Sequence, residues 1–255
     1  MELNKGTRKR RGNSRYYLFF FIALSVVALL GTSIWYGFTH IDLFTLQKVS
    51  LTGNEAIPDT LIYNITKPYL GMNLLAMPTA EIKAKVLTLS RVKSVKLHKR
   101  LPATLKLDIN ERKAAIYIKT IEGDLHPVDA EGIVLMKYSP IYREDMPIYS
   151  TYLNNHQIKP GYKLKNEGLQ KVLQLHQRIA KEVPAFLTQI SEYYLIDKTV
   201  YMIDAKTGTR IIPAQEDLTK QLSRYQFVQE NGNINKNSVV DLRYKNQVVV
   251  KAGNK

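Results

Sequence analysis

Residues 95–110 read VKLHKRLPATLKLDIN, which is two runs of alternating apolar and polar residues on either side of Leu101-Pro102. The apolar positions of the two runs are Val95 and Leu97, then Leu105, Leu107 and Ile109. A period of two is typical of strands that have one buried face and one solvated face. The stretch therefore predicts two consecutive strands whose apolar faces must be covered by another part of the chain.

The residues just upstream predict that cover. Val49 and Leu51 alternate with polar neighbours and are followed by Thr52-Gly53-Asn54, which predicts a strand and a turn. Two helices are then indicated by apolar residues at helical spacing. The first has Ile57, Leu61, Ile62 and Ile65, with Pro58 positioned for its first turn, and the second has Ile82, Val86 and Leu89 after Pro78-Thr79. The order β-α-α-β-β predicts a small domain in which both helices cover one face of a three-stranded sheet.

From Ala114 onward the pattern predicts a β-rich domain with two helices, so the fold class is α+β. Short strands are predicted at Ala115–Ile118, Leu125–Val128, Ile133–Met136, Tyr193–Ile196, Thr199–Ile203 and Arg210–Ile212. Helices are predicted between Asn166 and Val183, which includes His176 as a residue at the edge of the core, and from about Asp217 to Val228. Residues 137–165 contain no motif that assigns them a role.

The chain finishes with a predicted hairpin. Val239–Tyr244 and Gln247–Lys251 are rich in β-branched residues and are separated by Lys245-Asn246, where asparagine tolerates the positive φ of a tight turn. If Gln247–Lys251 is the last strand, its outer edge can accept a strand of another protein through main-chain hydrogen bonds. Val248, Val249 and Val250 would flank that junction. The alternative is that these valines complete the core and that Lys251 protects the edge.

The amino-terminal residues indicate a membrane anchor. Residues 1–15 form a basic tail, and residues 16–38 contain no charged side chain, with Tyr16, Tyr17, Trp35 and Tyr36 as aromatic anchors at the two ends. The basic tail predicts a cytoplasmic amino terminus and an extracytoplasmic remainder. A cleavable signal peptide is disfavoured because its apolar region is shorter, about 7 to 15 residues. A nucleic-acid-binding arm is the other alternative for the tail, but basic residues beside a span usually determine topology, so no nucleic-acid partner is expected.

Composition and motifs argue against an enzyme. The 255 residues carry a formal net charge of +15, which suits an anionic partner, and they include no cysteine and five histidines at unrelated spacings. No phosphate-binding loop and no hydrolase signature is present, and no metal site or cofactor is expected. The acidic pairs Asp129 with Glu131 and Glu144 with Asp145 lie among turn residues, so we expect solvated loops there and no acid and base catalyst.

Seven local stretches, taken in order behind a single span, resemble the FtsQ/DivIB family of bacterial cell-division proteins. They are VSLTGN at 49–54, GMNLL at 71–75, VKSVKL at 92–97, LPATL at 101–105, INER at 109–112, VDAEG at 128–132 and VDLRY at 240–244. The resemblance implies that residues 42–112 form a POTRA domain and residues 113–255 a β domain. The last turn departs from the family, which often has glycine where this chain has Lys245-Asn246.

The same resemblance implies a scaffold of the divisome in the inner membrane at the septum, with no catalytic step. Members of the family bind the bitopic proteins FtsB and FtsL, and link early division proteins to the peptidoglycan synthases FtsW and FtsI. FtsB adds a strand to the last strand of the β domain, and the matching positions here are Tyr244, Gln247, Val248, Val249, Val250 and Lys251. The alternatives are a POTRA-containing factor for envelope assembly or polypeptide transport, and an anchored cell-wall hydrolase.

Overall fold

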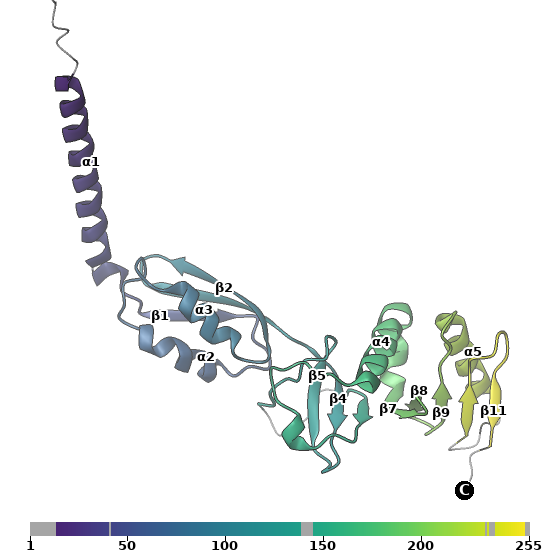
Figure 1. Ribbon diagram of the computed structural model, residues 1–255. Coiled ribbons are helices and arrows are strands. Elements are labelled where there is room, and N and C mark those ends of the chain that lie inside the picture. Colours follow the sequence, from purple (N-terminus) through teal and green to yellow (C-terminus); the bar gives the residue numbers. More distant parts are fainter. Residues whose placement is uncertain (1–13, 41, 139–144, 233, 235–237, 253–255) are drawn as a thin grey trace, which may run out of the picture.

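The computed structural model describes residues 14–40, 42–138, 145–232, 234 and 238–252, and begins with one long helix, α1 (Ser14–His40), followed by two β-sheets (Figure 1). Within α1, the 22 residues Tyr16–Gly37 are apolar enough to cross a membrane. A helix of that length extends about 33 Å, which matches the hydrocarbon core of a bilayer. The predicted span is therefore a single exposed helix, as its sequence requires.

The first sheet has three strands and the predicted order of elements. These are β1 (Lys48–Thr52), α2 (Asp59–Thr66), α3 (Thr79–Leu87), β2 (Val92–Arg100) and β3 (Thr104–Glu111), with short 3-10 helices at Asp42–Phe44 and Lys67–Tyr69. The spatial order is β1-β3-β2, with β1 parallel and β2 antiparallel to β3. The central strand β3 therefore joins the two edge strands.

The alternating residues of the first sheet meet the helices in one core. Leu105 and Leu107 of β3 and Ile62 of α2 are fully buried. Ile82 and Val86 of α3 belong to the same cluster. In Figure 1 both helices lie on one side of the sheet, as the amphipathic pattern predicts.

The second sheet has eight strands, and two longer helices contribute to its core. Its elements are β4 (Ala114–Lys119), β5 (Leu125–Asp129), β6 (Ile148–Ser150), α4 (Glu167–Glu182), β7 (Ile190–Ile196), β8 (Thr199–Asp204), β9 (Arg210–Ile212), α5 (Leu218–Asn231), β10 (Val239–Asp241) and β11 (Val249–Lys251), with 3-10 helices at Asn155–Gln157 and Pro184–Gln189. The spatial order is β11-β10-β9-β8-β7-β6-β4-β5. The sheet is mixed, because β6 is parallel to both β4 and β7, and β9 is parallel to β10.

Apart from its terminal hairpin, the second sheet differs from the sequence prediction in two details. The predicted strand Ile133–Met136 is wrong, because Ile133 and Val134 form only isolated bridges, to Lys163 and Val128. Conversely, β6 has no counterpart in the sequence prediction, since three residues are too few for an alternating pattern to be visible. The main-chain N–H of Tyr117 donates to the carbonyl of Pro147 at 2.9 Å, so β6 is placed by its neighbour β4.

Gly53 makes the turn after β1 possible and generates a test of this sheet. It has a φ of +80°, and a Cβ atom there would lie 2.1 Å from the carbonyl oxygen of Ile109 in β3. We expect Gly53→Ala to lower the free energy of unfolding by more than about 2 kcal/mol, because left-handed strain alone amounts to about 1–2 kcal/mol. Urea unfolding of the detergent-solubilised chain, followed by circular dichroism, measures the change.

The matched control is Gly123→Ala. Gly123 also has a positive φ, +92°, but a Cβ atom added there would have no neighbour within 4 Å. This variant should lose only about 1 kcal/mol. Equal losses for the two variants would contradict the close approach of Gly53 to β3.

Candidate functional site

The last strand, β11, lies at one end of the eight-stranded sheet. It pairs antiparallel with β10, with Val250 opposite Val240, and no strand in the described part of the chain pairs with its other side. At the opposite end of the sheet, β5 is covered: the N–H of Asp129 donates to the carbonyl of Ile133 at 3.0 Å, and that of Leu135 to Pro127 at 2.8 Å. Only the β11 edge is therefore open to an added strand among the described strands of this sheet.

The structure brings the six predicted contact residues to this edge, but with a shorter strand. Both expected strands are trimmed, from Val239–Tyr244 to Val239–Asp241 and from Gln247–Lys251 to Val249–Lys251. Tyr244 and Gln247 lie in the connection, with the Tyr244 side chain 49% exposed. Val248 packs against the core, whereas Val250 is 43% exposed and Lys251 is exposed. The two interpretations of the valines therefore apply to different residues.

Helix α5 holds the connection between β10 and β11 in place. The side-chain amide of Gln221 donates to the carbonyl of Tyr244 at 3.3 Å, and the guanidinium of Arg224 donates to the side-chain oxygen of Asn246 at 3.0 Å. Asn246 has a φ of +61°, which confirms the positive φ predicted for it. The predicted tight turn at Lys245-Asn246 is wrong, because residues 242–248 all lie in the connection between β10 and β11. The contacts from α5 therefore hold the connection in place and leave the outer edge of β11 unused.

A buried carboxylate fixes the start of the connection. Asp241, the last residue of β10, is completely buried, and its oxygens accept hydrogen bonds from Nε and Nη2 of Arg243 at 2.9 and 2.7 Å. The main-chain N–H of Arg243 donates to the same carboxylate at 3.1 Å. These hydrogen bonds with Arg243 lower the pKa of Asp241. Both residues lie in the stretch VDLRY at 240–244, but no contact between them is predicted from the sequence. An acid two residues before an arginine could have indicated this ion pair.

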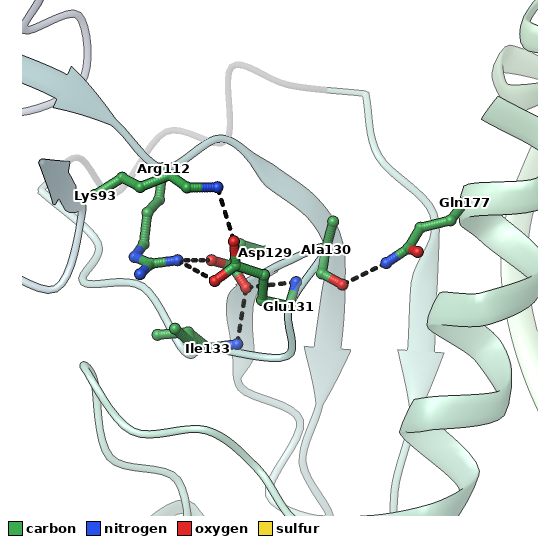
Figure 2. A network of polar contacts seen from close by, with 7 residues as sticks. All are labelled: Lys93, Arg112, Asp129, Ala130, Glu131, Ile133 and Gln177. Carbon is green, nitrogen blue, oxygen red and sulfur yellow. Dashed lines mark hydrogen bonds and ion pairs between the residues drawn. The ribbon is translucent and has the colours of Figure 1, made fainter. Parts of the chain in front are cut away.

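The acidic pair Asp129 and Glu131 belongs to a polar cluster between the two sheets (Figure 2). Arg112, just after β3, donates from Nη1 to Asp129 at 2.7 Å and to Glu131 at 2.9 Å. Glu131 also pairs with Lys93 of β2 at 2.7 Å. The expectation of a solvated loop is wrong for Asp129, which is buried, because Arg112 and the turn amides replace water around its carboxylate.

The rest of this cluster ties it to α4. The main-chain N–H groups of Glu131 and Ile133 donate to Asp129 at 2.9 and 2.8 Å, and Gln177 of α4 donates to the carbonyl of Ala130 at 2.5 Å (Figure 2). Lys93 and then Arg112 lower the pKa of Glu131 to about 2. A carboxylate with that pKa stays ionised at neutral pH and is a poor proton acceptor there. These contacts therefore have a structural role: they link the three-stranded sheet, the turn after β5 and α4, and we call them the joint between the sheets.

The remaining candidate groups are the second acidic pair and His176. Glu144 lies outside the described residues, and Asp145 is exposed. His176 is buried with Nδ1 3.1 Å from the hydroxyl of Tyr193, which confirms its position at the edge of the core. Among the residues that the structure describes, no group of three or more histidine, cysteine, aspartate or glutamate side chains could hold a metal ion.

Comparison with known proteins relates the chain to cell-division proteins. Residues 44–112 match the family profile described as "POTRA domain, FtsQ-type". The chain is similar to the cell division protein DivIB of Clostridium botulinum strain Hall, with 23% identity over 91% of this chain and 94% of that protein. DivIB of Clostridium acetobutylicum is 21% identical over 81% of this chain and 82% of that protein. The match to FtsQ of Corynebacterium glutamicum, 26% identical, covers 44% of this chain and about half (48%) of that protein.

The joint between the sheets predicts unequal effects of two substitutions. Arg112→Met leaves the buried Asp129 carboxylate without its cation, and we expect a loss of about 3 kcal/mol in the free energy of unfolding. Glu131→Gln removes the ion pairs of a half-exposed carboxylate with Lys93 and Arg112 and should lose less than about 1 kcal/mol. Urea unfolding of both variants measures the difference. A loss at Arg112→Met no larger than that at Glu131→Gln would contradict a buried joint.

Asp241 predicts a dependence of stability on pH. Because its pKa is lowered in the folded protein, its contribution to stability is present above the unfolded value, about 3.9, and is lost as pH falls through the lowered folded value. The urea midpoint should therefore fall less between pH 5 and pH 3 in Asp241→Asn than in the unmodified chain.

The control for that measurement is the exposed Asp145→Asn, which makes the same change in charge. It should retain the pH dependence of the unmodified chain. A parallel fall in all three proteins would show that the Asp241–Arg243 pair does not stabilise the fold.

Proposed function

We propose that this chain, which belongs to the FtsQ/DivIB family of cell-division proteins, is a non-enzymatic scaffold of the divisome held in the cytoplasmic membrane by α1. The basic residues before α1 favour a cytoplasmic amino terminus, so both sheets lie outside the cytoplasm. The protein acts at the division septum. Residues 42–112 serve as the POTRA domain and residues 113–255 as the β domain of this scaffold.

The open β11 edge is the observation that carries the proposed mechanism. A bitopic partner, FtsB together with FtsL, adds a strand of its extracytoplasmic part to β11. Main-chain hydrogen bonds to Val249–Lys251 supply the pairing, and the exposed side chains of Tyr244 and Val250 supply apolar contact area. Gln247 and Lys251 complete this contact region, with Lys251 available to an acidic partner residue, while Val248 supports β11 by packing against the core.

The supporting arrangement fits binding better than catalysis. Asp129 and Glu131 are engaged in ion pairs, and Asp241 is engaged by Arg243. Acid and base catalysis would need at least one carboxylate that is positioned to exchange a proton with a substrate and is not engaged by a cation. Through FtsB and FtsL the scaffold connects early division proteins to the septal synthases FtsW and FtsI.

Binding of the detergent-solubilised full chain to the FtsB and FtsL ectodomains of the same organism tests this proposal. A chain truncated after Asn246 lacks β11 and should lose binding, while circular dichroism reports whether it stays folded. Tyr244→Ala should weaken binding about 5-fold or more, as expected for an aromatic contact at an interface.

Tyr152→Ala is the matched control, because Tyr152 is a highly exposed tyrosine in a different part of the eight-stranded sheet unit. It should bind as the unmodified chain does. Undiminished binding by the folded, truncated chain would contradict strand addition. Absence of binding by every form, including the unmodified chain, would favour the envelope-assembly alternative.

A further inference from the structure

Exposed apolar residues gather at the end of the three-stranded sheet that follows α1. Four large side chains there are exposed: Leu43, Leu70, Met72 and Leu101. They come from three separate segments, residues 43–48, 67–76 and 98–104. We call these three segments together the membrane-proximal end.

Hydrogen bonds show that the three segments lie side by side. The N–H of Leu46 donates to the carbonyl of Met72 at 2.8 Å, and that of Gly71 donates to Leu46 at 3.0 Å. The N–H of Gln47 donates to the carbonyl of Ala103 at 2.9 Å, which brings the β2–β3 turn to the same place. Residue 43 follows α1 by three positions, and in Figure 1 the β2–β3 turn lies beside the end of that helix.

Basic residues dominate the charge of this end, although Asp42 precedes the first segment and Asp108 of β3 lies 3.3 Å from His98. The three segments contain no aspartate or glutamate and carry the basic residues Lys48, Lys67, His98, Lys99 and Arg100. All five of these side chains are exposed. Apolar side chains surrounded by basic residues are typical of surfaces that rest in the headgroup region of an anionic bilayer.

We propose that the membrane-proximal end binds the surface of the bilayer that α1 spans. Leu43, Leu70, Met72 and Leu101 enter the headgroup region, and the basic residues contact the phosphates of anionic phospholipids. The occupant is lipid because the surface is continuous with the membrane-spanning helix and begins within a few residues of its end. This contact fixes the tilt of the three-stranded sheet relative to the membrane.

The absence of cysteine from the sequence allows a single label to be placed at will. We would label Leu101→Cys with an environment-sensitive fluorophore in the full chain, reconstituted alone into nanodiscs that contain phosphatidylglycerol and lipids brominated near the headgroup. The label should show blue-shifted emission and at least 2-fold stronger quenching than at Ile121→Cys. Ile121 is the matched control because it is equally exposed, 59% against 57%, and lies in the β4–β5 turn.

Charge reversal tests the role of the basic residues. Lys48→Glu with Arg100→Glu should reduce quenching at position 101 to the level of the control site, and nanodiscs of phosphatidylcholine alone should do the same. Lys181→Glu with Lys206→Glu changes the charge equally at exposed positions of the other sheet unit and should have no effect.

Two results would overturn the proposal. The first is equal quenching at positions 101 and 121 in anionic nanodiscs. The second is a label that stays exposed in nanodiscs and is shielded only when FtsB and FtsL are added, which would assign this surface to a protein partner. Since the nanodiscs contain this chain alone, neither a positive nor a negative result depends on strand addition at β11.

Discussion

An edge strand leaves the outward-facing half of its backbone N–H and C=O groups without a partner in its own sheet, and β11 occupies that position. Such groups form strong hydrogen bonds with any extended segment that lies alongside. The binding free energy available at this edge depends on how well β11 is ordered in advance, because ordering a strand during binding costs conformational entropy. The contacts of Gln221, Arg224 and Arg243 hold the connection in place within the chain itself.

The remaining architecture gives that edge a defined place relative to the membrane. Helix α1 and β11 lie at opposite ends of the described chain (Figure 1). Between them, Arg112 joins the two sheets through Asp129 and Glu131, and Gln177 extends the joint to α4 (Figure 2). If the three-stranded sheet rests on the bilayer as proposed, these contacts would set the height of the β11 edge above the membrane. A bitopic partner would then meet the edge at a fixed distance along its own chain.

Local patterns were sufficient for most of the secondary structure and insufficient for the long-range polar contacts. The alternation at 95–110 and the helical spacing around Ile62 and Ile82 depend on neighbouring residues, and the structure contains those strands and helices. β6 is defined by its pairing with β4 and β7, so a three-residue segment gave no signal. The burial of Asp129 depends on Arg112, 17 residues away, and an acid among turn residues looked solvated without it. The proposed contact residues follow from the position of the last strand and from the family resemblance and stay a prediction, whereas the contacts of α5 with the connection are visible only in three dimensions.

Disulfide trapping between β11 and FtsB tests the central claim most directly, since the chain contains no cysteine of its own. Single cysteines at Val249, Val250 and Lys251 would each be paired with a scan of single cysteines along the FtsB ectodomain. Strand addition predicts one favoured partner position for each β11 residue, and a shift of that position by one residue for each step along β11. Trapping that shows no such register, or that is equally efficient from the three-stranded sheet, would contradict the account.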